Sequence, residues 1–328
     1  MKKLFIFALL FSILILTPIV LNLYYNHLLK PASASKSEQI FIVKPGQPVI
    51  QIAKNLEAAG LIRNGLAFRL YIAQSGISKT IQAGDFRLSS KMSAKEIAKE
   101  LTHGAIDVWI TFPEGTRVEE MADIIDKKLN TSENEKYQFD KKEFIKNATE
   151  GQMFPDTYLI AKDATAGAIA KRLETTFSEK VDRKILLKGA KNDLTEDQVI
   201  TLASLLEREA RSNEERPIIA GIILNRINQG IPLQVDATVQ YAKGYDSANN
   251  TWWSQVTQDN YTQVKSPYNT YLHVGLPPKP ISNPGLDSIR AAAEPSDTPY
   301  MFYLHDTEGK IHYAKTSEEH AKNIQEFL

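Results

Sequence analysis

The residues with the clearest capacity for chemistry lie in one segment, which reads QVITLASLLEREARS. At about 100° per residue in a helix, Val199, Ala203 and Leu206 share one apolar face. Glu207 and Glu209 fall on opposite flanks of this face. A carboxyl there is partly removed from water, which favours its protonated form and suits it to donate a proton. Most glutamates on a helix flank are simply solvated, so periodicity alone does not choose between the two.

Two small residues indicate where a substrate would lie against this helix. Ala203 and Ser204 precede Glu207 by about one turn, so we expect them to leave space beside its side chain. Thr195 and Gln198 form a capping-box pattern, which predicts that the helix begins just after Thr195. The helix would therefore present Glu207 near its C-terminal end.

Downstream of this helix the chain is rich in residue types that bind sugars. Gln234, Asp236 and Thr238 alternate, so on a strand they would point to one face. Pro- and Gly-containing loops follow between residues 266 and 285, with aromatic rings for sugar faces and amides for hydroxyl groups. The alternative is a set of ordinary turns with structural tyrosines, and we favour a structural role for Trp252-Trp253.

The elements that would position these residues are short strands and amphipathic helices. A strand, a glycine turn and a helix are predicted around Gly46 and Val49, and the pattern recurs at the same offset around Gly115 and Val118. This weak internal repeat has coincidence as its alternative, because glycine turns between strands and helices are common. Other predicted helices cover residues 66–73, 97–101, 169–177 and 218–227, with a strand at 86–88 and a closing hairpin and helix over 300–328.

The composition excludes several classes of function. Lys and Arg number 39, as do Asp and Glu, so the chain has no overall attraction for nucleic acid. Cysteine is absent, which excludes disulfides, thiolate metal sites and thiol nucleophiles. The six histidines form no HExxH motif and no phosphate-binding glycine loop occurs, so we expect neither metal nor cofactor. A cytosolic lyase using pyridoxal phosphate is an alternative class, against which the N-terminal segment argues.

That N-terminal segment predicts a membrane anchor. Residues 4–26 carry no charge, and about 23 residues of helix reach roughly 34 Å, enough to cross a bilayer. Lys2 and Lys3 precede the run, so residues 1–3 are predicted in the cytoplasm and the rest of the chain outside it. A cleaved signal peptide is the alternative, since Ala32-Ser33-Ala34 has the form of a cleavage site. Residues 27–38 are predicted as a linker.

Six segments, in this order, resemble the signature series of the MltG (YceG-like) endolytic murein transglycosylase family. They are Glu150–Tyr158, Leu202–Glu209, Asn225-Arg226, Leu233–Thr238, Ser266–Tyr271 and Gly275–Pro278. The resemblance implies the fold class α+β, with a single N-terminal transmembrane helix. It also implies a small LysM-like α/β module at residues 39–105 and a mixed α+β catalytic domain at residues 106–328.

The resemblance further implies a reaction and its residues. The essential glutamate would be Glu207, cleaving the MurNAc–GlcNAc β-1,4 bond of peptidoglycan without water. Protonated Glu207 would donate to the glycosidic oxygen and then take the proton of the C6 hydroxyl that closes a 1,6-anhydro ring. The substrate-binding residues would be Gln234, Asp236, Tyr268 and Asn269. A hydrolase would need a second carboxylate, for which Asp236 is the sequence's candidate.

The implied partners are nascent glycan strands close to the cytoplasmic (inner) membrane. Penicillin-binding peptidoglycan synthases are expected partners on the same family resemblance. The alternative from another class is a non-catalytic peptidoglycan-binding scaffold of the cell-wall synthesis machinery. The intact glutamate motif around Glu207 favours the enzyme.

Overall fold

The computed structural model describes residues 16–33, 38–103, 107–130, 139–162 and 164–328. Its mixture of helices and short strands confirms the expected α+β class. The chain divides into two compact units, the first formed by Met1–Ile110 and Tyr158–Lys162 and the second by Thr111–Thr157 and Asp163–Leu328. The predicted boundary between residues 105 and 106 falls in a stretch outside the described residues, so it stays a prediction.

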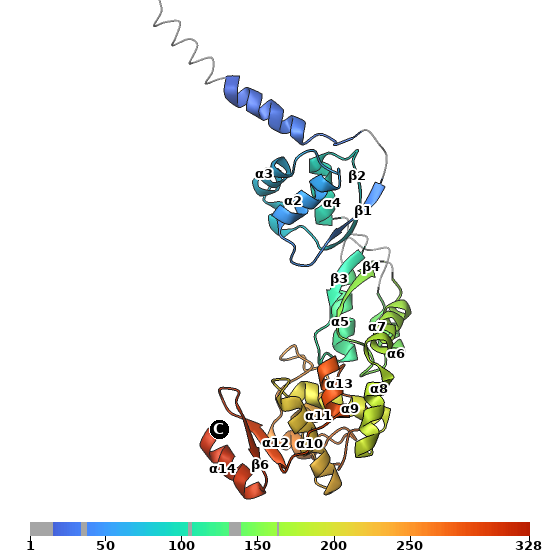
Figure 1. Cartoon of the computed structure of the whole chain (residues 1–328), viewed down its shortest axis with the longest axis vertical. Coiled ribbons are helices and arrows are strands. Elements are labelled where there is room, and N and C mark those ends of the chain that lie inside the picture. The colour runs from blue at the N-terminus through green and yellow to red at the C-terminus, as the bar shows by residue number, and fades with distance from the viewer. Residues whose placement is uncertain (1–15, 34–37, 104–106, 131–138, 163) are drawn as a thin grey trace, which may run out of the picture. The chain divides into compact units, whose positions relative to one another are not determined.

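In the first unit, helices α2, α3 and α4 pack beside a sheet, and these elements are coloured blue to green in Figure 1. The sheet has the order β1-β2-β3-β4, with β1 antiparallel to β2 and β2 antiparallel to β3. Phe41 of β1 lies opposite Phe86 of β2, and both rings belong to the buried core of the unit. The elements are β1 (Glu38–Val43), α2 (Val49–Ala58), α3 (Gly65–Gln74), η1 (Ile77–Lys79), β2 (Gly84–Ser89), α4 (Ala94–His103), β3 (Asp107–Thr111) and β4 (Thr157–Ala161). The LysM-like identity of this unit stays a prediction.

The first unit also contains a helix over residues 16–28. Of the predicted span 4–26, residues 4–15 lie outside the described residues. No helix within the described ranges is both long enough and apolar enough to cross a membrane. Part of the predicted linker packs on the first unit, because Leu29 is buried and its carbonyl accepts a hydrogen bond from the Ala94 N–H at 3.0 Å.

The two predicted strand–turn–helix units have the same local structure. β1 leads through Gly46 to α2, and β3 leads through Gly115 to α5 (Val118–Leu129). Gly46 has φ of 73° and Gly115 has φ of 75°, a conformation that is costly for residues with a Cβ. The repeated geometry confirms the predicted turns.

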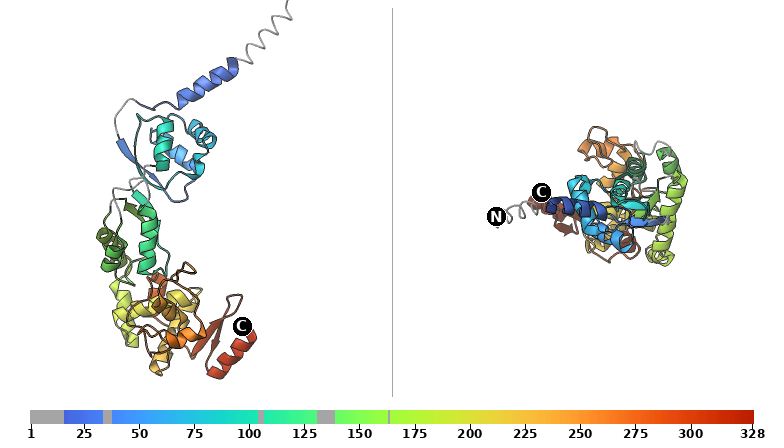
Figure 2. Two further views of the ribbon diagram at one scale, coloured as in Figure 1. Left: turned by 180° about the vertical axis from the view of Figure 1, so that it is seen from behind. Right: turned by 90° about the horizontal axis from the view of Figure 1, so that it is seen from above.

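The second unit is mainly helical and is built around α9. Helices α8, α10, α11 and α13 all contact α9, and they form the cluster labelled in Figure 1. Figures 1 and 2 show the β5–β6 hairpin and α14 to one side of this cluster. Besides α5, the elements are α6 (Lys141–Asn147), α7 (Ala166–Lys180), α8 (Arg183–Leu187), η2 (Lys188–Asn192), α9 (Glu196–Glu209), α10 (Glu215–Asn228), α11 (Asp236–Lys243), α12 (Gln258–Gln263), α13 (Leu286–Ala293), β5 (Phe302–His305), β6 (Ile311–Ala314) and α14 (Ser317–Phe327).

One predicted element is wrong and another is confirmed. The alternation at residues 234–238 does not form a strand, because Asp236 begins α11 and Gln234 has φ of 56°. Alternation of polar and apolar residues over so few positions also fits a turn followed by a helix, which is the structure adopted. The closing hairpin is confirmed, since β5 and β6 pair antiparallel and α14 follows them.

Candidate active site

Helix α9 presents Glu207 in its last turn. The predicted capping box forms at the other end, where Thr195 Oγ1 accepts the Gln198 N–H at 3.2 Å and Gln198 Oε1 accepts the Thr195 N–H at 2.9 Å. All residues from Val199 to Leu206 are buried. The helix ends at Glu209, and Ala210 is already extended. Burial of the helix body therefore fixes Glu207 at the point where the chain leaves the core.

Both oxygens of the Glu207 carboxylate accept hydrogen bonds. Oε1 lies 3.1 Å from Nη2 of Arg216, and Oε2 accepts the backbone N–H of Gly285 at 2.9 Å. Only 6% of the Glu207 side chain and 12% of the Arg216 side chain are exposed. The sequence predicted the burial of Glu207 but not the cation that pairs with its carboxyl group.

Arg216 is itself held in place by residues of two elements. Its Nε donates to Ser288 Oγ at 2.8 Å, and its Nη1 donates to Asn213 Oδ1. Asn213 in turn donates to Asp287 Oδ2 at 3.0 Å. Because every link is a hydrogen bond, the guanidinium has a fixed position against Glu207.

The space expected beside Ala203 and Ser204 is filled by the chain itself. Ser204 is fully buried, and its Oγ accepts the Ile281 N–H at 3.0 Å. Ser282 Oγ donates to the Ser204 carbonyl at 3.2 Å. The prediction of substrate space at Ser204 is therefore wrong, because a loop 77 residues away in sequence packs there. This loop instead carries the Gly285 N–H to Glu207.

A second carboxyl, that of Glu114, lies beside Glu207. A Cβ on Gly285 would overlap the Glu114 carboxylate, and a Cβ on Gly115 would lie 3.4 Å from Glu207 Cγ. Partial burial of the Glu114 carboxyl, followed by the negative charge of Glu207, raises its pKa, while Arg216 opposes the shift. Sequence analysis missed Glu114, although its Glu114-Gly115 turn was visible as half of the internal repeat. Only the fold shows which end of α9 that turn meets.

Asn283 joins three loops behind the two carboxyls. Its Oδ1 accepts the N–H groups of Gly151 and Met153 at 2.8 and 2.9 Å, and its Nδ2 donates to the Thr116 carbonyl at 3.0 Å. The same amide donates to Glu150 Oε1 at 2.8 Å. Burial raises the pKa of Glu150 to about 8, so this carboxyl is largely protonated at neutral pH.

Aromatic residues of a long loop pack against the same region. The indole N–H of Trp253 donates to Glu120 Oε2 at 2.8 Å, and that of Trp252 donates to Asp123 Oδ2 at 3.0 Å. The guanidinium of Arg208, next to Glu207 in α9, lies 3.8 Å from the centre of the Trp253 ring. These contacts agree with the structural role expected for the tryptophan pair.

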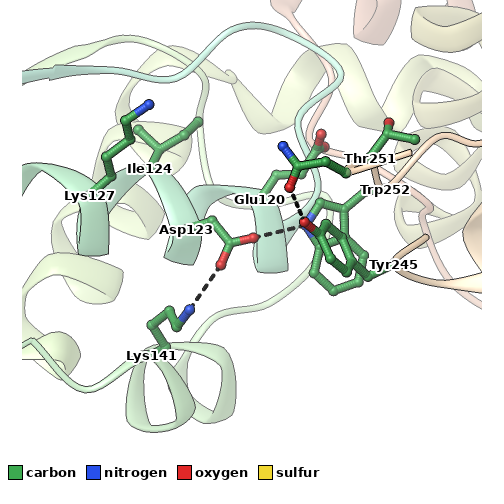
Figure 3. Close-up of a pocket in the computed structure, with 9 residues that line it drawn as sticks. Glu120, Asp123, Ile124, Lys127, Lys141, Tyr245, Thr251 and Trp252 are labelled. Carbon is green, nitrogen blue, oxygen red and sulfur yellow. Dashed lines mark hydrogen bonds and ion pairs between the residues drawn. The ribbon is translucent and has the colours of Figure 1, made fainter. Parts of the chain in front are cut away.

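An open pocket of 680 Å³ has Trp252 in its lining. Figure 3 shows Asp123 between the Trp252 indole and Lys141, and the Tyr245 ring against Trp252. The residues that line it are Glu120, Asp123, Ile124, Lys127, Lys141, Tyr245, Asn250, Thr251 and Trp252. The carboxylates of Glu120 and Asp123 already accept hydrogen bonds from indole N–H groups or from the Lys141 ammonium. A ligand in this pocket would therefore contact the aromatic rings more than the acids.

The four predicted substrate-binding residues gather on a second group of loops. The Gln234 N–H donates to the Thr270 carbonyl at 3.1 Å, and Tyr271 donates from its hydroxyl to Asp236 Oδ1 at 2.6 Å. Gln234 and Asp236 are both exposed at the surface. Tyr268 packs on Tyr241 with ring centres 4.9 Å apart.

Asn269 differs from the other three residues because its side-chain amide bonds to backbone groups of α12 and of the segment that follows it. Its Nδ2 donates to the carbonyls of Tyr261 and Val264 at 3.1 and 2.9 Å, and its Oδ1 accepts the Tyr271 N–H at 2.9 Å. The residue is fully buried. This geometry favours a loop-positioning role for Asn269 over direct substrate contact.

Glu209, the second glutamate in the last turn of α9, has other partners than Glu207. Its Oε2 accepts the Tyr303 hydroxyl hydrogen at 2.7 Å, and burial raises its pKa. The negative charge of Asp236 acts on Glu209 in the same direction. The structure therefore groups Asp236 with Glu209, while Glu114 is grouped with Glu207.

Comparison with known proteins agrees with the fold and these motifs. Residues 41–326 match the model of the YceG-like family. A Bacillus subtilis (strain 168) protein named endolytic murein transglycosylase is 31% identical, over 93% of this chain and 89% of its own length. A yceG-like protein from Listeria monocytogenes, known from a crystal structure, is 28% identical, with a TM-score of 0.58 over 88% of this chain and 99% of its own. The chain therefore belongs to the YceG-like family, as its motifs predicted.

A second relative is longer than this chain. An endolytic murein transglycosylase from Streptococcus pneumoniae serotype 2 (strain D39 / NCTC 7466) is 29% identical over 92% of this chain. The chain spans 60% of that relative's length.

Proposed function

We propose that this protein is an endolytic peptidoglycan lytic transglycosylase, a carbon–oxygen lyase that acts on a polysaccharide. The observation that carries the proposal is the Glu207 carboxylate, fixed by Arg216 and Gly285 at the end of a buried helix. Relatives named endolytic murein transglycosylase support the same reaction. The substrate is the MurNAc–GlcNAc β-1,4 bond of glycan strands.

Glu207 is the essential carboxyl of the proposed reaction. Protonated Glu207 donates to the glycosidic oxygen as the bond from this oxygen to MurNAc C1 breaks. The resulting carboxylate takes the proton of the MurNAc C6 hydroxyl as that oxygen bonds to C1, so no water is used and Glu207 is protonated again. Arg216 and the Gly285 N–H orient the carboxylate and hold its charge. The product strand ends in 1,6-anhydro-MurNAc, and cleavage of nascent strands in this way terminates their elongation.

The substrate contacts proposed for the reaction lie on the loops around α11. Gln234 and Asp236 are exposed and offer an amide and a carboxylate to sugar hydroxyls. Tyr268 offers part of a ring face, and Asn269 holds the loop on which Tyr268 lies. No metal or organic cofactor is needed for a proton transfer between carboxyl and sugar.

The proposed location is the cytoplasmic membrane, with the catalytic part outside the cytoplasm. The uncharged run 4–26 supplies a single-pass anchor, and Lys2-Lys3 directs the N-terminus inward. Residues 39–105 form a LysM-like module that holds peptidoglycan, and residues 106–328 form the catalytic domain. Peptidoglycan synthases working on the same strands are the proposed protein partners.

A hydrolase is the second candidate, and the position of Glu114 beside Glu207 favours it. Glycoside hydrolases use two carboxyls across the bond that breaks. Mass spectrometry of the products released from isolated sacculi separates the two functions. A lytic transglycosylase gives 1,6-anhydro ends, lighter by one water molecule than the reducing ends of a hydrolase. Absence of any cleavage by the purified protein would instead support the non-catalytic scaffold.

A further inference from the structure

Arg208 and Arg216 both lie beside Glu207, and they differ in what their guanidinium groups bind. All three nitrogens of Arg216 donate hydrogen bonds within the protein, one of them to Glu207. Within the described ranges, no hydrogen bond or ion pair reaches the Arg208 guanidinium, and its Nε is buried without a partner. Because buried polar groups are nearly always paired, this unpaired guanidinium indicates a partner from outside the chain.

The Arg208 side chain is held in place although its nitrogens are unpaired. Its guanidinium lies 3.8 Å from the centre of the Trp253 ring, a distance typical of a cation–π contact. Trp253 is fixed in turn by its indole N–H, which donates to Glu120 Oε2 at 2.8 Å. Burial lowers the pKa of Arg208, but nearby carboxyls, that of Glu120 first, oppose this shift, and the guanidinium stays charged. The ring face therefore stabilises the cation without using any of its N–H donors.

Arg208 and Glu207 lie beside the same turn. A Cβ on Gly115 would lie 3.4 Å from Glu207 Cγ and from Arg208 Cδ, and 3.5 Å from Arg208 Nη1. Among the described residues, Nε is the only nitrogen of Arg208 that is both buried and unpartnered. The two terminal nitrogens, which have no partner there either, therefore stay accessible to solvent next to Glu207.

The proposed substrate contains two β-1,4 bonds that differ little in chemistry. MurNAc and GlcNAc alternate along a glycan strand, and both sugars have a C6 hydroxyl and an acetamido group. Only MurNAc carries the 3-O-lactyl group, whose acyl oxygen accepts hydrogen bonds. An enzyme that breaks the bond at MurNAc C1, and leaves the next bond intact, therefore needs a contact with the lactyl group.

We propose that Arg208 is a substrate-binding residue whose terminal N–H groups donate to the acyl oxygen of the MurNAc lactyl group, which places MurNAc C1 at Glu207. The proposal rests on the proposed lytic transglycosylase function, because that function fixes which of the two bonds is cut. A guanidinium suits this acceptor, since a charged donor forms the stronger hydrogen bonds and its planar fork orients them. Arg216 is not available for the same contact, because its nitrogens already bond within the protein.

Binding of uncharged ligands tests the proposal without cleavage. The protein is the full chain in detergent with Glu207→Gln, which is expected to bind glycans without cutting them. One ligand is a GlcNAc–MurNAc tetrasaccharide whose lactyl carboxyls are converted to methylamides, and the other is chitotetraose, which has the acetamido groups alone. Calorimetric titration gives the ratio of the two affinities. We expect this parent to prefer the muramyl ligand, and Arg208→Met to weaken binding of that ligand about 10–100-fold and to lose most of the preference.

Two further variants complete the test. Arg183→Met, which removes an exposed arginine of α8, is the control and leaves both affinities unchanged. Arg208→Lys keeps the charge but not the fork, so it also lowers the preference, and it replaces Arg208→Met if that variant fails to fold. A preference that persists in the folded Arg208 variants would overturn the proposal, and so would a parent that shows no preference. Reducing MurNAc ends released by the wild-type protein would refute the proposed function, a result that the affinity ratio does not affect.

Discussion

Glu150 offers a direct test of the buried network behind the site. Burial raises the pKa of this carboxyl from 4.5 to about 8. Between these two values the unfolded chain releases the proton and the folded chain keeps it, so unfolding is favoured increasingly as pH rises. Stability that is present below pH 4.5 is therefore lost gradually up to the folded pKa of about 8.

The size of this effect follows from the shift. One pKa unit corresponds to about 1.4 kcal/mol, so the carboxyl lowers the unfolding free energy by up to about 3 kcal/mol at pH 7. Glu150→Gln removes the titration and keeps acceptors for the N–H of Val118 and the amide of Asn283. We expect the variant to match wild type near pH 4.5 and to melt roughly 6–12 °C higher at pH 7.

Thermal unfolding of the full chain in detergent, followed by circular dichroism from pH 4.5 to 8, measures the difference. The exposed Glu179→Gln serves as the control and leaves the pH dependence as in wild type. Parallel melting profiles for wild type and Glu150→Gln across this range would refute the reasoning. They would mean that Glu150 is ionised in the folded state and that its donors offset the cost of burial.

Three further predictions concern the site and the anchor. Glu207→Gln lowers glycan cleavage by at least about 10²–10⁴-fold with the fold intact, whereas Glu209→Gln keeps much more activity because the Glu209 carboxyl is bonded to the Tyr303 hydroxyl; the reverse order in a cleavage assay would identify Glu209 as the essential residue. Asn283→Ala leaves several buried backbone groups without partners and costs at least about 2 kcal/mol in denaturant unfolding, a loss that an unchanged midpoint would contradict. The full-length protein fractionates with membranes, and a soluble form that begins near Ser35 would show instead that the N-terminal segment is cleaved.

The sequence predicted best those features that are local. The capping box at Thr195 and the apolar face of α9 depend on residues within a few positions, and both formed as expected. The turns at Gly46 and Gly115 were also visible, because few residues other than glycine tolerate the left-handed conformation. The helical periodicity did not distinguish Glu207 from Glu209, and only the resemblance to a family identified Glu207 as the catalytic candidate.

The features that the sequence did not predict depend on tertiary contacts. Nothing near Glu207 in sequence indicates that Arg216 or Gly285 would hold it, or that Glu114 would lie beside it. The space expected at Ser204 is filled by a loop 77 residues later in the chain. Periodicity describes one element at a time, so it does not show which element covers a given face.

The contacts of Asn283 limit which segments of this site can be exchanged for those of a related protein. A single side chain bonds to the 116 turn, to the 151–153 loop and to Glu150, while its backbone pairs with the residues around Gly115. In a chimera that takes one of these segments from a relative, the new segment must keep its hydrogen bonds to Asn283 while the other segments hold this side chain in place. Grafting of this catalytic centre onto another scaffold therefore requires all three loops together, although Asn283 lies 132 residues from Gly151 and 167 residues from Thr116 in the chain.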